Sequence, residues 1–135
     1  MTKKVLIIGG GVAGFSTAIA MQQRDIDVEI VELHRNWRVY HVGIIVQSNF
    51  VRALTELGVG NEAVDAGFAY RGWRFLNNED GSEIDRDEGV STAGDEYPAD
   101  LGLARPALHD VLYKRVRGLG IPLRQGVTYS SITDN

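Results

Sequence analysis

The stretch VLIIGGGVAGF, residues 5–15, decides the fold of this chain. Val5–Ile8 is a continuous apolar and largely β-branched run, which predicts a strand buried on both faces, as in parallel sheets. Residues 12–24 then place apolar side chains at helical spacing, and residues 27–33 return to the pattern of a mostly buried strand. The sequence therefore predicts a βαβ unit and an α/β fold.

Three glycines lie between the first strand and the helix. Gly9, Gly11 and Gly14 have the spacing G-x-G-x-x-G. In such a loop the first glycine allows a tight turn, the second lets a diphosphate approach the backbone, and the third lets the helix pack against the sheet. A tight turn without a ligand would explain one glycine, but not three followed by an acid at the end of the next strand. The loop therefore predicts a dinucleotide site at the helix N-terminus.

The acid is Glu32, which lies 18 residues after Gly14. A carboxylate in this place can accept hydrogen bonds from both hydroxyls of an adenosine ribose. It would repel a 2′-phosphate, because both groups are negatively charged. The sequence therefore predicts FAD or NAD, and not NADP, as the bound nucleotide.

Composition excludes several other classes of function. The 135 residues suffice for about one domain, and no apolar run approaches the length of a membrane span. The chain contains no cysteine, which excludes disulfides and thiolate chemistry and fits a cytoplasmic location. The net charge of −4, without a long basic block, does not indicate a nucleic-acid partner. His34 and His109 have no matching partners for a metal site, so no metal is predicted. His41 lies in a loop, where a histidine is more often simply exposed than a base or a covalent flavin link.

The middle of the chain predicts a helix and a hairpin. After a polar loop and the short apolar piece 43–47, a helix is expected with Ser48 as its N-cap and Gly58 as its C-terminal stop. Residues 68–88 predict a β-hairpin around an Asp-Gly turn, and residues 88–103 predict a long loop. Towards the C-terminus, we expect a helix over 105–120 and two short strands over 121–135.

Three stretches together resemble one known family, the flavin-dependent aromatic hydroxylases (group A FAD monooxygenases of the p-hydroxybenzoate hydroxylase type). They are the N-terminal βαβ unit, the segment WRVYHVGIIVQSNFVRALTELGV over 37–59, and RPALHDVLYKRV over 105–116. The resemblance implies a Rossmann-like FAD-binding βαβ unit with a β-hairpin extension, incomplete relative to the full family fold. Residues 1–135 would be the N-terminal portion of the FAD-binding domain, and the hairpin 68–88 would belong to the substrate-side sheet.

The resemblance also implies roles for individual residues. Glu32 would hold the ribose, Arg105 would reach the diphosphate or ribityl region, and Arg38 would lie near the flavin. Gln47 would lie on the isoalloxazine side, and the Val127 backbone would meet the adenine. The full set of residues expected to bind the cofactor is Gly9, Gly11, Val12, Ala13, Gly14, Glu32, Leu33, Arg38, Gln47, Arg105 and Val127.

The chain departs from the family pattern at three places. Leu33 replaces a basic residue, and Arg24 and Asp25 replace a glycine at the end of the first helix. The family's Gly-Asp motif, which binds the diphosphate and ribityl chain, would lie downstream of Asn135. The chain is therefore expected to be a piece of a longer protein, or to need a second chain that carries the rest of the fold.

In the implied reaction, NAD(P)H reduces FAD and the reduced flavin uses O2 to hydroxylate a small aromatic substrate. No catalytic side chain is predicted. Two alternatives stay open: an NAD-binding domain of the dehydrogenase type, and a catalytically silent nucleotide-binding fragment.

Overall fold

The computed structural model describes residues 4–37, 39–131 and 133, and the chain divides into two compact units. The first unit comprises residues 1–40 and 108–135, and the second comprises residues 41–107. None of the helices in the described part of the chain has the length and apolar character needed to cross a lipid bilayer.

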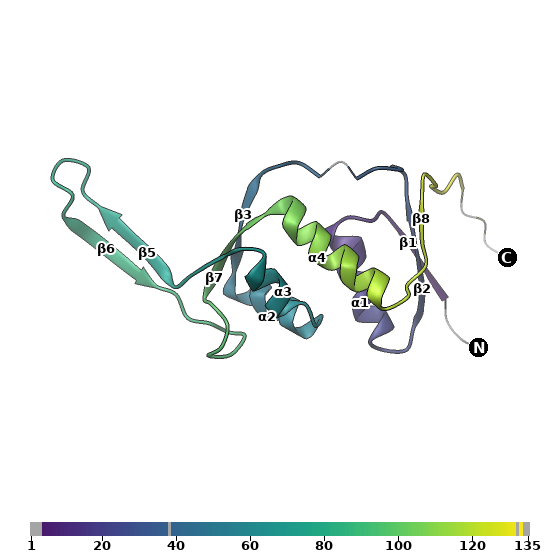
Figure 1. Ribbon diagram of the computed structural model, residues 1–135, viewed down its shortest axis with the longest axis horizontal. Coiled ribbons are helices and arrows are strands. Elements are labelled where there is room, and N and C mark those ends of the chain that lie inside the picture. The colour runs from purple at the N-terminus through teal and green to yellow at the C-terminus, as the bar shows by residue number, and fades with distance from the viewer. Residues whose placement is uncertain (1–3, 38, 132, 134–135) are drawn as a thin grey trace. The chain divides into compact units, whose positions relative to one another are not determined.

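The first unit is built on a parallel three-stranded sheet in the order β1-β2-β8 (Figure 1). Its strands are β1 (Lys4–Ile8), β2 (Asp27–Glu32) and β8 (Leu123–Gln125). Helix α1 (Val12–Gln22) connects β1 to β2 and packs on both strands, which confirms the βαβ unit expected from the sequence. A second strand after β8 was also predicted, but the described residues of this region form β8 alone.

The core of the first unit lies between this sheet and its helices. Phe15, Ala18 and Ile19 of α1 are buried, as are Val28 and Ile30 of β2. These positions follow the helical and strand periodicities, so burial of the apolar face stabilises both elements.

Strand β1 departs from the sequence prediction. Burial on both faces was expected, but Leu6 is 50% exposed and Ile8 is 48% exposed. β1 is an edge strand of the sheet, and Ile7, on the opposite face, lies against the start of α1. The continuous apolar run therefore has only one covered face within this unit.

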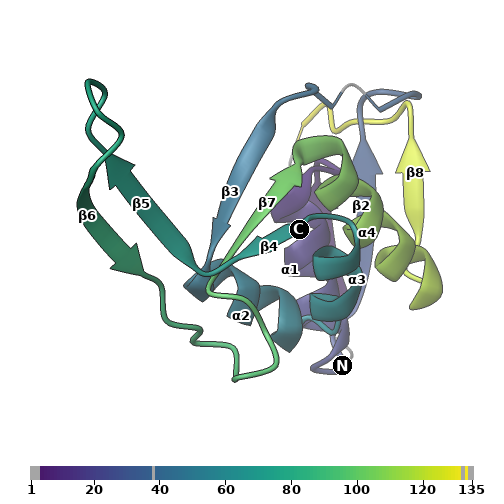
Figure 2. The same cartoon turned by 60° about the vertical axis from the view of Figure 1, so that its left-hand side comes forward.

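The second unit contains an antiparallel sheet in the order β3-β7-β4 (Figure 2). Its strands are β3 (Gly43–Gln47), β7 (Asp100–Ala104) and β4 (Phe68–Tyr70), and the helices α2 (Ser48–Glu56) and α3 (Gly60–Asp65) follow β3. Helix α2 packs on β3 and β7, so that Val51 and Leu54 are buried.

Strand β7 corrects the prediction of a loop over 88–103. Leu101 and Leu103 are buried on one face of the strand with Gly102 between them, so the alternation spans only five residues. Pro98 and the acidic residues before it are typical of a loop, so the predicted loop extended over this short strand.

The predicted hairpin is also shorter than expected. β5 (Gly72–Leu76) and β6 (Glu83–Glu88) form a separate two-stranded ribbon, while β4 pairs with β7 instead. Arg71 separates β4 from β5, and Gly72 lies so close to the Asp87 carbonyl that a side chain would collide with it. The ribbon is therefore residues 72–88, and residues 68–70 belong to the three-stranded sheet.

Helix α4 (Arg105–Gly118) begins in the second unit and continues in the first. Pro106 lies in its first turn and Gly120 follows its end with a φ of +70°, as the sequence predicted. Gly58 likewise ends α2, with a φ of +74°. Ser48 is not the N-cap of α2, however: Gln47 holds that position, and Ser48 is the first helical residue.

Candidate functional site

The glycine loop connects β1 to α1 at the carboxyl end of the parallel sheet. Gly9 has a φ of +106°, which favours glycine, and its N–H donates to the Val31 carbonyl at 2.8 Å. A side chain on Gly14 would collide with the carbonyl oxygen of Gly9. Both glycines are therefore required by the turn itself and by the close packing of α1 on the loop.

Gly11 has no such structural reason to be glycine. Its φ of −87° and ψ of −175° are ordinary extended values, and a Cβ placed on it would meet no atom within 4 Å. Gly11 is the N-cap of α1, no side chain caps the helix, and no acid lies in its first turn. The helix therefore begins at Val12 and Ala13 with no side-chain cap and with no acidic residue of its own in the first turn.

Glu32 stands at the end of β2 and binds the loop. Its Oε2 accepts the Gly10 N–H at 2.8 Å, and its Oε1 accepts the His34 N–H at 2.8 Å. Partial burial opposes ionisation, but the two N–H donors, with His34 and His109 nearby, lower the pKa of Glu32 below its ordinary value. The carboxylate is therefore ionised at neutral pH and retains two of its four lone pairs for other donors.

Two apolar side chains lie on the chain segments beside Glu32. Leu33 follows it directly and is 59% exposed, and Val127 is 38% exposed. The Val127 N–H donates to the Glu32 carbonyl at 3.0 Å, so this segment is hydrogen-bonded to the end of β2. The first unit thus brings together the glycine loop, Glu32, Leu33 and Val127.

An aromatic cluster beneath the loop was not found by sequence reasoning. Phe15, Trp37, His109 and Tyr113 pack with ring centroids 4.7–6.1 Å apart. The Trp37 indole occupies the space that a side chain on Gly10 would need, and the buried His109 reaches the Gly10 carbonyl at 2.9 Å. The only sequence signal was a histidine within the apolar stripe of α4.

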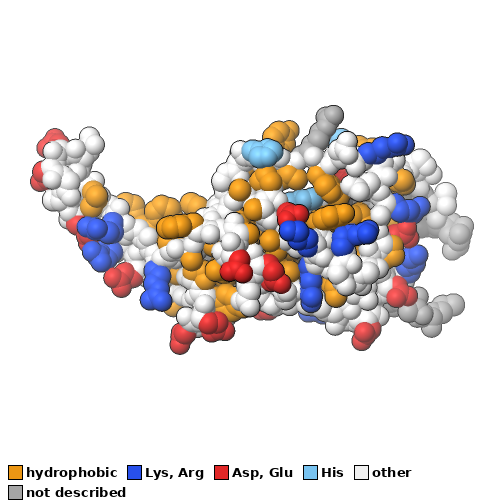
Figure 3. Space-filling view, in the orientation of Figure 1, with side chains coloured by type: hydrophobic (Ala, Val, Ile, Leu, Met, Phe, Trp, Pro, Cys, Tyr) orange, Lys and Arg blue, Asp and Glu red, His pale blue; other side chains and the backbone are white. Residues whose placement is uncertain are grey.

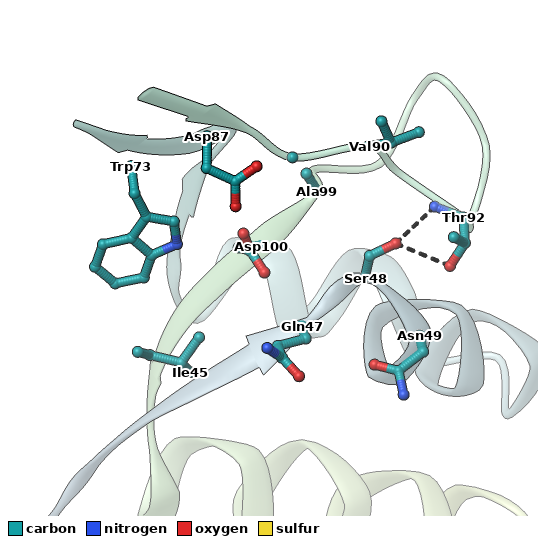
Figure 4. A pocket seen from close by; sticks show the side chains of 11 residues that line it. Ile45, Gln47, Ser48, Asn49, Trp73, Asp87, Val90, Thr92, Ala99 and Asp100 are labelled. Atoms are coloured by element: carbon teal, nitrogen blue, oxygen red, sulfur yellow. Dashed lines mark hydrogen bonds between the residues drawn. The ribbon is translucent and has the colours of Figure 1, made fainter. Parts of the chain in front are cut away.

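The second unit holds two other expected residues. Gln47 lines a pocket of about 710 Å³, where Trp73, Asp87 and Asp100 face the same space (Figure 4). The lining includes no Lys or Arg, so this pocket does not favour an anion. Arg105 begins α4, is exposed, and donates its backbone N–H to the Val42 carbonyl at 2.9 Å.

Arg38, the remaining expected residue, lies outside the described residues.

The donors and acceptors of the first unit fit a nucleotide diphosphate. An uncapped helix N-terminus with open space over Gly11 suits a diphosphate, and the free lone pairs of Glu32 suit two ribose hydroxyls. The diphosphate-binding backbone thus follows the first strand and the ribose-binding carboxylate ends the second, as in a strand–loop–helix fold that binds a dinucleotide.

Comparisons with known proteins point in the same direction. Residues 2–135 match the family described as "FAD binding domain". Phenazine 1,6-dicarboxylic acid hydroxylase PhzS of Lysobacter antibioticus is 32% identical over 114 residues, which is 84% of this chain and 28% of that protein. Aurachin C monooxygenase/isomerase of Stigmatella aurantiaca is 34% identical over 113 residues, which is 83% of this chain and 29% of that protein.

A solved structure gives the same result for the fold. The tetrameric form of 2-methyl-3-hydroxypyridine-5-carboxylic acid oxygenase superposes with a TM-score of 0.75 at 25% identity, over 93% of this chain and 32% of that one. The chain thus spans about a third of the length of the relatives it matches.

Proposed function

We propose, since the chain belongs to the FAD binding domain family, that its first compact unit holds the ADP half of FAD. The observation that carries this proposal is Gly11, which is exposed at the uncapped start of α1 and for which the packing of the described residues gives no reason to be glycine. A ligand lying against the backbone at this position supplies the missing reason, because any side chain would stand between it and the N–H groups.

The proposed roles follow the geometry of the loop. Gly9 and Gly14 shape the turn, and the backbone at Gly11, Val12 and Ala13 faces the diphosphate. Glu32 accepts the ribose hydroxyls with its two remaining lone pairs, while Leu33 and Val127 offer apolar surface beside the adenine. FAD, when bound, supplies the redox chemistry, and these residues bind and orient it.

Three further residues are proposed for the flavin half of the cofactor. Gln47 and Arg105 belong to the second unit, where Gln47 lines the pocket and Arg105 is exposed. Arg38 is proposed from the resemblance alone.

For the whole protein we propose an NAD(P)H- and O2-dependent flavin monooxygenase that hydroxylates an aromatic or related small molecule. The support is the names of the relatives, which include a phenazine 1,6-dicarboxylic acid hydroxylase and an aurachin C monooxygenase/isomerase. The remainder of the fold would come from further sequence or from a second chain. A cytoplasmic location stays a prediction from the sequence.

The ribbon β5–β6 is proposed to belong to the substrate-side sheet. Two-stranded ribbons are marginally stable alone, and this one leaves Trp73, Phe75, Leu76 and Ile84 between 44% and 69% exposed. Hydrophobic side chains are visible along it in Figure 3. Such a surface is typical of a ribbon that packs against further structure.

The proposal is tested by titrating the purified chain with FAD and following the quenching of flavin fluorescence. NAD is titrated in parallel, and ADP and FMN are used as competitors. We expect FAD to bind more tightly than NAD, and ADP to displace it better than FMN, because the site holds the ADP half. Tighter binding of NAD would favour the dehydrogenase-type domain, and better displacement by FMN would contradict the assignment of the first unit.

A further inference from the structure

Gly10 is the buried residue of the glycine loop, and both of its backbone polar groups have partners. Its N–H donates to Oε2 of Glu32 at 2.8 Å, and its carbonyl oxygen lies 2.9 Å from Nε2 of His109. A carbonyl oxygen only accepts, so Nε2 of His109 carries the proton and donates it. Glu32 therefore binds the N–H of Gly10, and His109 binds its carbonyl oxygen.

His109 is held rigidly in the position from which it donates. The side chain is 6% exposed, and its ring centroid lies 5.0 Å from that of Phe15 and 4.7 Å from that of Trp37. Packing on two sides fixes the ring, so the direction of the Nε2–H bond is set by the core of the unit and not by solvent.

The carbonyl that His109 binds belongs to the peptide joining Gly10 to Gly11. In a trans peptide the C=O and the N–H point in opposite directions. With the carbonyl turned toward His109, the Gly11 N–H points the opposite way, away from His109. Among the described residues, the Gly11 N–H has no hydrogen-bond acceptor.

A peptide flanked by two glycines is the least restrained kind of peptide, because neither residue has a Cβ to limit its rotation. We propose that His109 is a positioning residue that locks the Gly10–Gly11 peptide with the Gly11 N–H directed at the diphosphate of the bound nucleotide. This inference rests on the proposed function for the identity of the ligand. The orientation of the peptide, however, is a property of the free chain.

The test uses two variants of nearly equal shape, His109→Gln and His109→Met. Both lose the ring and its aromatic contacts, but only glutamine keeps an N–H donor at the end of the side chain. Each variant is titrated with FAD, and the Gly11 amide resonance is recorded in the FAD-free chain. We expect His109→Met to bind FAD about fivefold more weakly than His109→Gln, as one lost hydrogen bond implies. Both variants lose the ring current of His109, so the informative comparison is between them: the Gly11 resonance should lie closer to its wild-type position in His109→Gln than in His109→Met.

Equal FAD affinities and equal Gly11 resonances in the two folded variants would overturn the inference. If the wild-type chain does not bind FAD, the proposed function fails, while the Gly11 resonances still decide the orientation of the peptide. If circular dichroism shows that His109→Met does not fold, His109→Gln decides alone. The inference then requires that variant to keep the wild-type FAD affinity, and a loss of affinity overturns it.

Discussion

Replacing Gly14 or Gly11 by alanine should have opposite consequences, because the packing of the protein requires Gly14, whereas the nucleotide that we propose requires Gly11. In Gly14→Ala the new Cβ would overlap the Gly9 carbonyl oxygen and lie 3.1 Å from the carbonyl carbon. Both are backbone atoms, so the loop itself must move, at a cost of about 3 kcal/mol. Alanine's higher helix propensity returns about 1 kcal/mol. The net loss of about 2 kcal/mol lowers the melting temperature by about 8 °C.

Gly11→Ala is the matched control, since it adds the same methyl group three residues earlier. Here the Cβ meets no atom within 4 Å and the backbone is already extended. Alanine caps a helix less well than glycine, but it also restricts the unfolded chain, and these effects of about 0.5–1 kcal/mol nearly cancel. The methyl group would, however, stand where the diphosphate approaches. We therefore expect an unchanged melting temperature and an FAD affinity reduced about tenfold or more.

Thermal unfolding followed by circular dichroism measures the first effect, and FAD titration by flavin fluorescence measures the second. Both variants and the wild type are compared in the same buffer without added nucleotide for the melts. The reasoning is refuted if Gly14→Ala melts like the wild type, or if Gly11→Ala binds FAD with wild-type affinity.

Three further predictions concern single side chains. Folding lowers the pKa of Glu32 below its ordinary value, so the stabilisation it provides is present at neutral pH and is lost as the pH falls through the lowered pKa. Glu32→Gln should therefore melt with less dependence on acidification, and an unchanged dependence would contradict this. Asp25 has a φ of +56°, a conformation that glycine adopts with less strain. Asp25→Gly should therefore raise the free energy of unfolding, measured by denaturant titration, by about 0.5 kcal/mol. A lower free energy of unfolding would contradict this. The Ser48 hydroxyl accepts the Thr92 N–H at 2.7 Å and donates to Oγ1 of Thr92, as Figure 4 shows. Ser48→Ala should therefore speed hydrogen exchange of the Thr92 amide, and an unchanged exchange rate would show that this contact does not protect it.

The elements that the sequence predicted correctly are those whose determinants are local. The βαβ unit follows from the periodicity of residues 5–33, and α4 follows from Pro106 and the glycines after it. Strand β7 was missed because its five residues become a strand only by pairing with β3 and β4 on either side. Ser48 is a good N-cap residue by type, but its hydroxyl is bonded to Thr92, 44 residues away, which no local pattern contains.

The turn after the first helix contains a left-handed residue at the place where the sequence departs from the family pattern. Asp25 takes the left-handed conformation at this turn, which is where glycine is favoured and where Asp and Asn are the tolerated alternatives. A glycine at position 25 would therefore fit this backbone conformation without strain.

The candidate site also contains residues that a local sequence pattern indicates and residues that it does not. Its glycines and Glu32 were predicted because the motif lies within one βαβ unit. His109 was not, because it reaches the loop from a helix 99 residues further along the chain. Sequence reasoning examined His109 as a metal ligand and found no partners for it. Its partner is a backbone carbonyl, which every residue possesses and no sequence pattern marks.

Glu32 shows how a residue assigned to a ligand can first serve the protein. Its two oxygens each accept one backbone N–H, from Gly10 and from His34, so the carboxylate fixes the loop before any nucleotide arrives. Two lone pairs remain, so the same side chain can also accept the ribose hydroxyls that we propose. A loop ordered in advance loses less entropy on binding, which favours affinity. A weaker FAD affinity in a Glu32 variant would thus combine a lost ribose contact with a looser loop. Gly11→Ala, by contrast, changes only the approach to the proposed diphosphate, and the His109 pair changes only the orientation of the loop peptide.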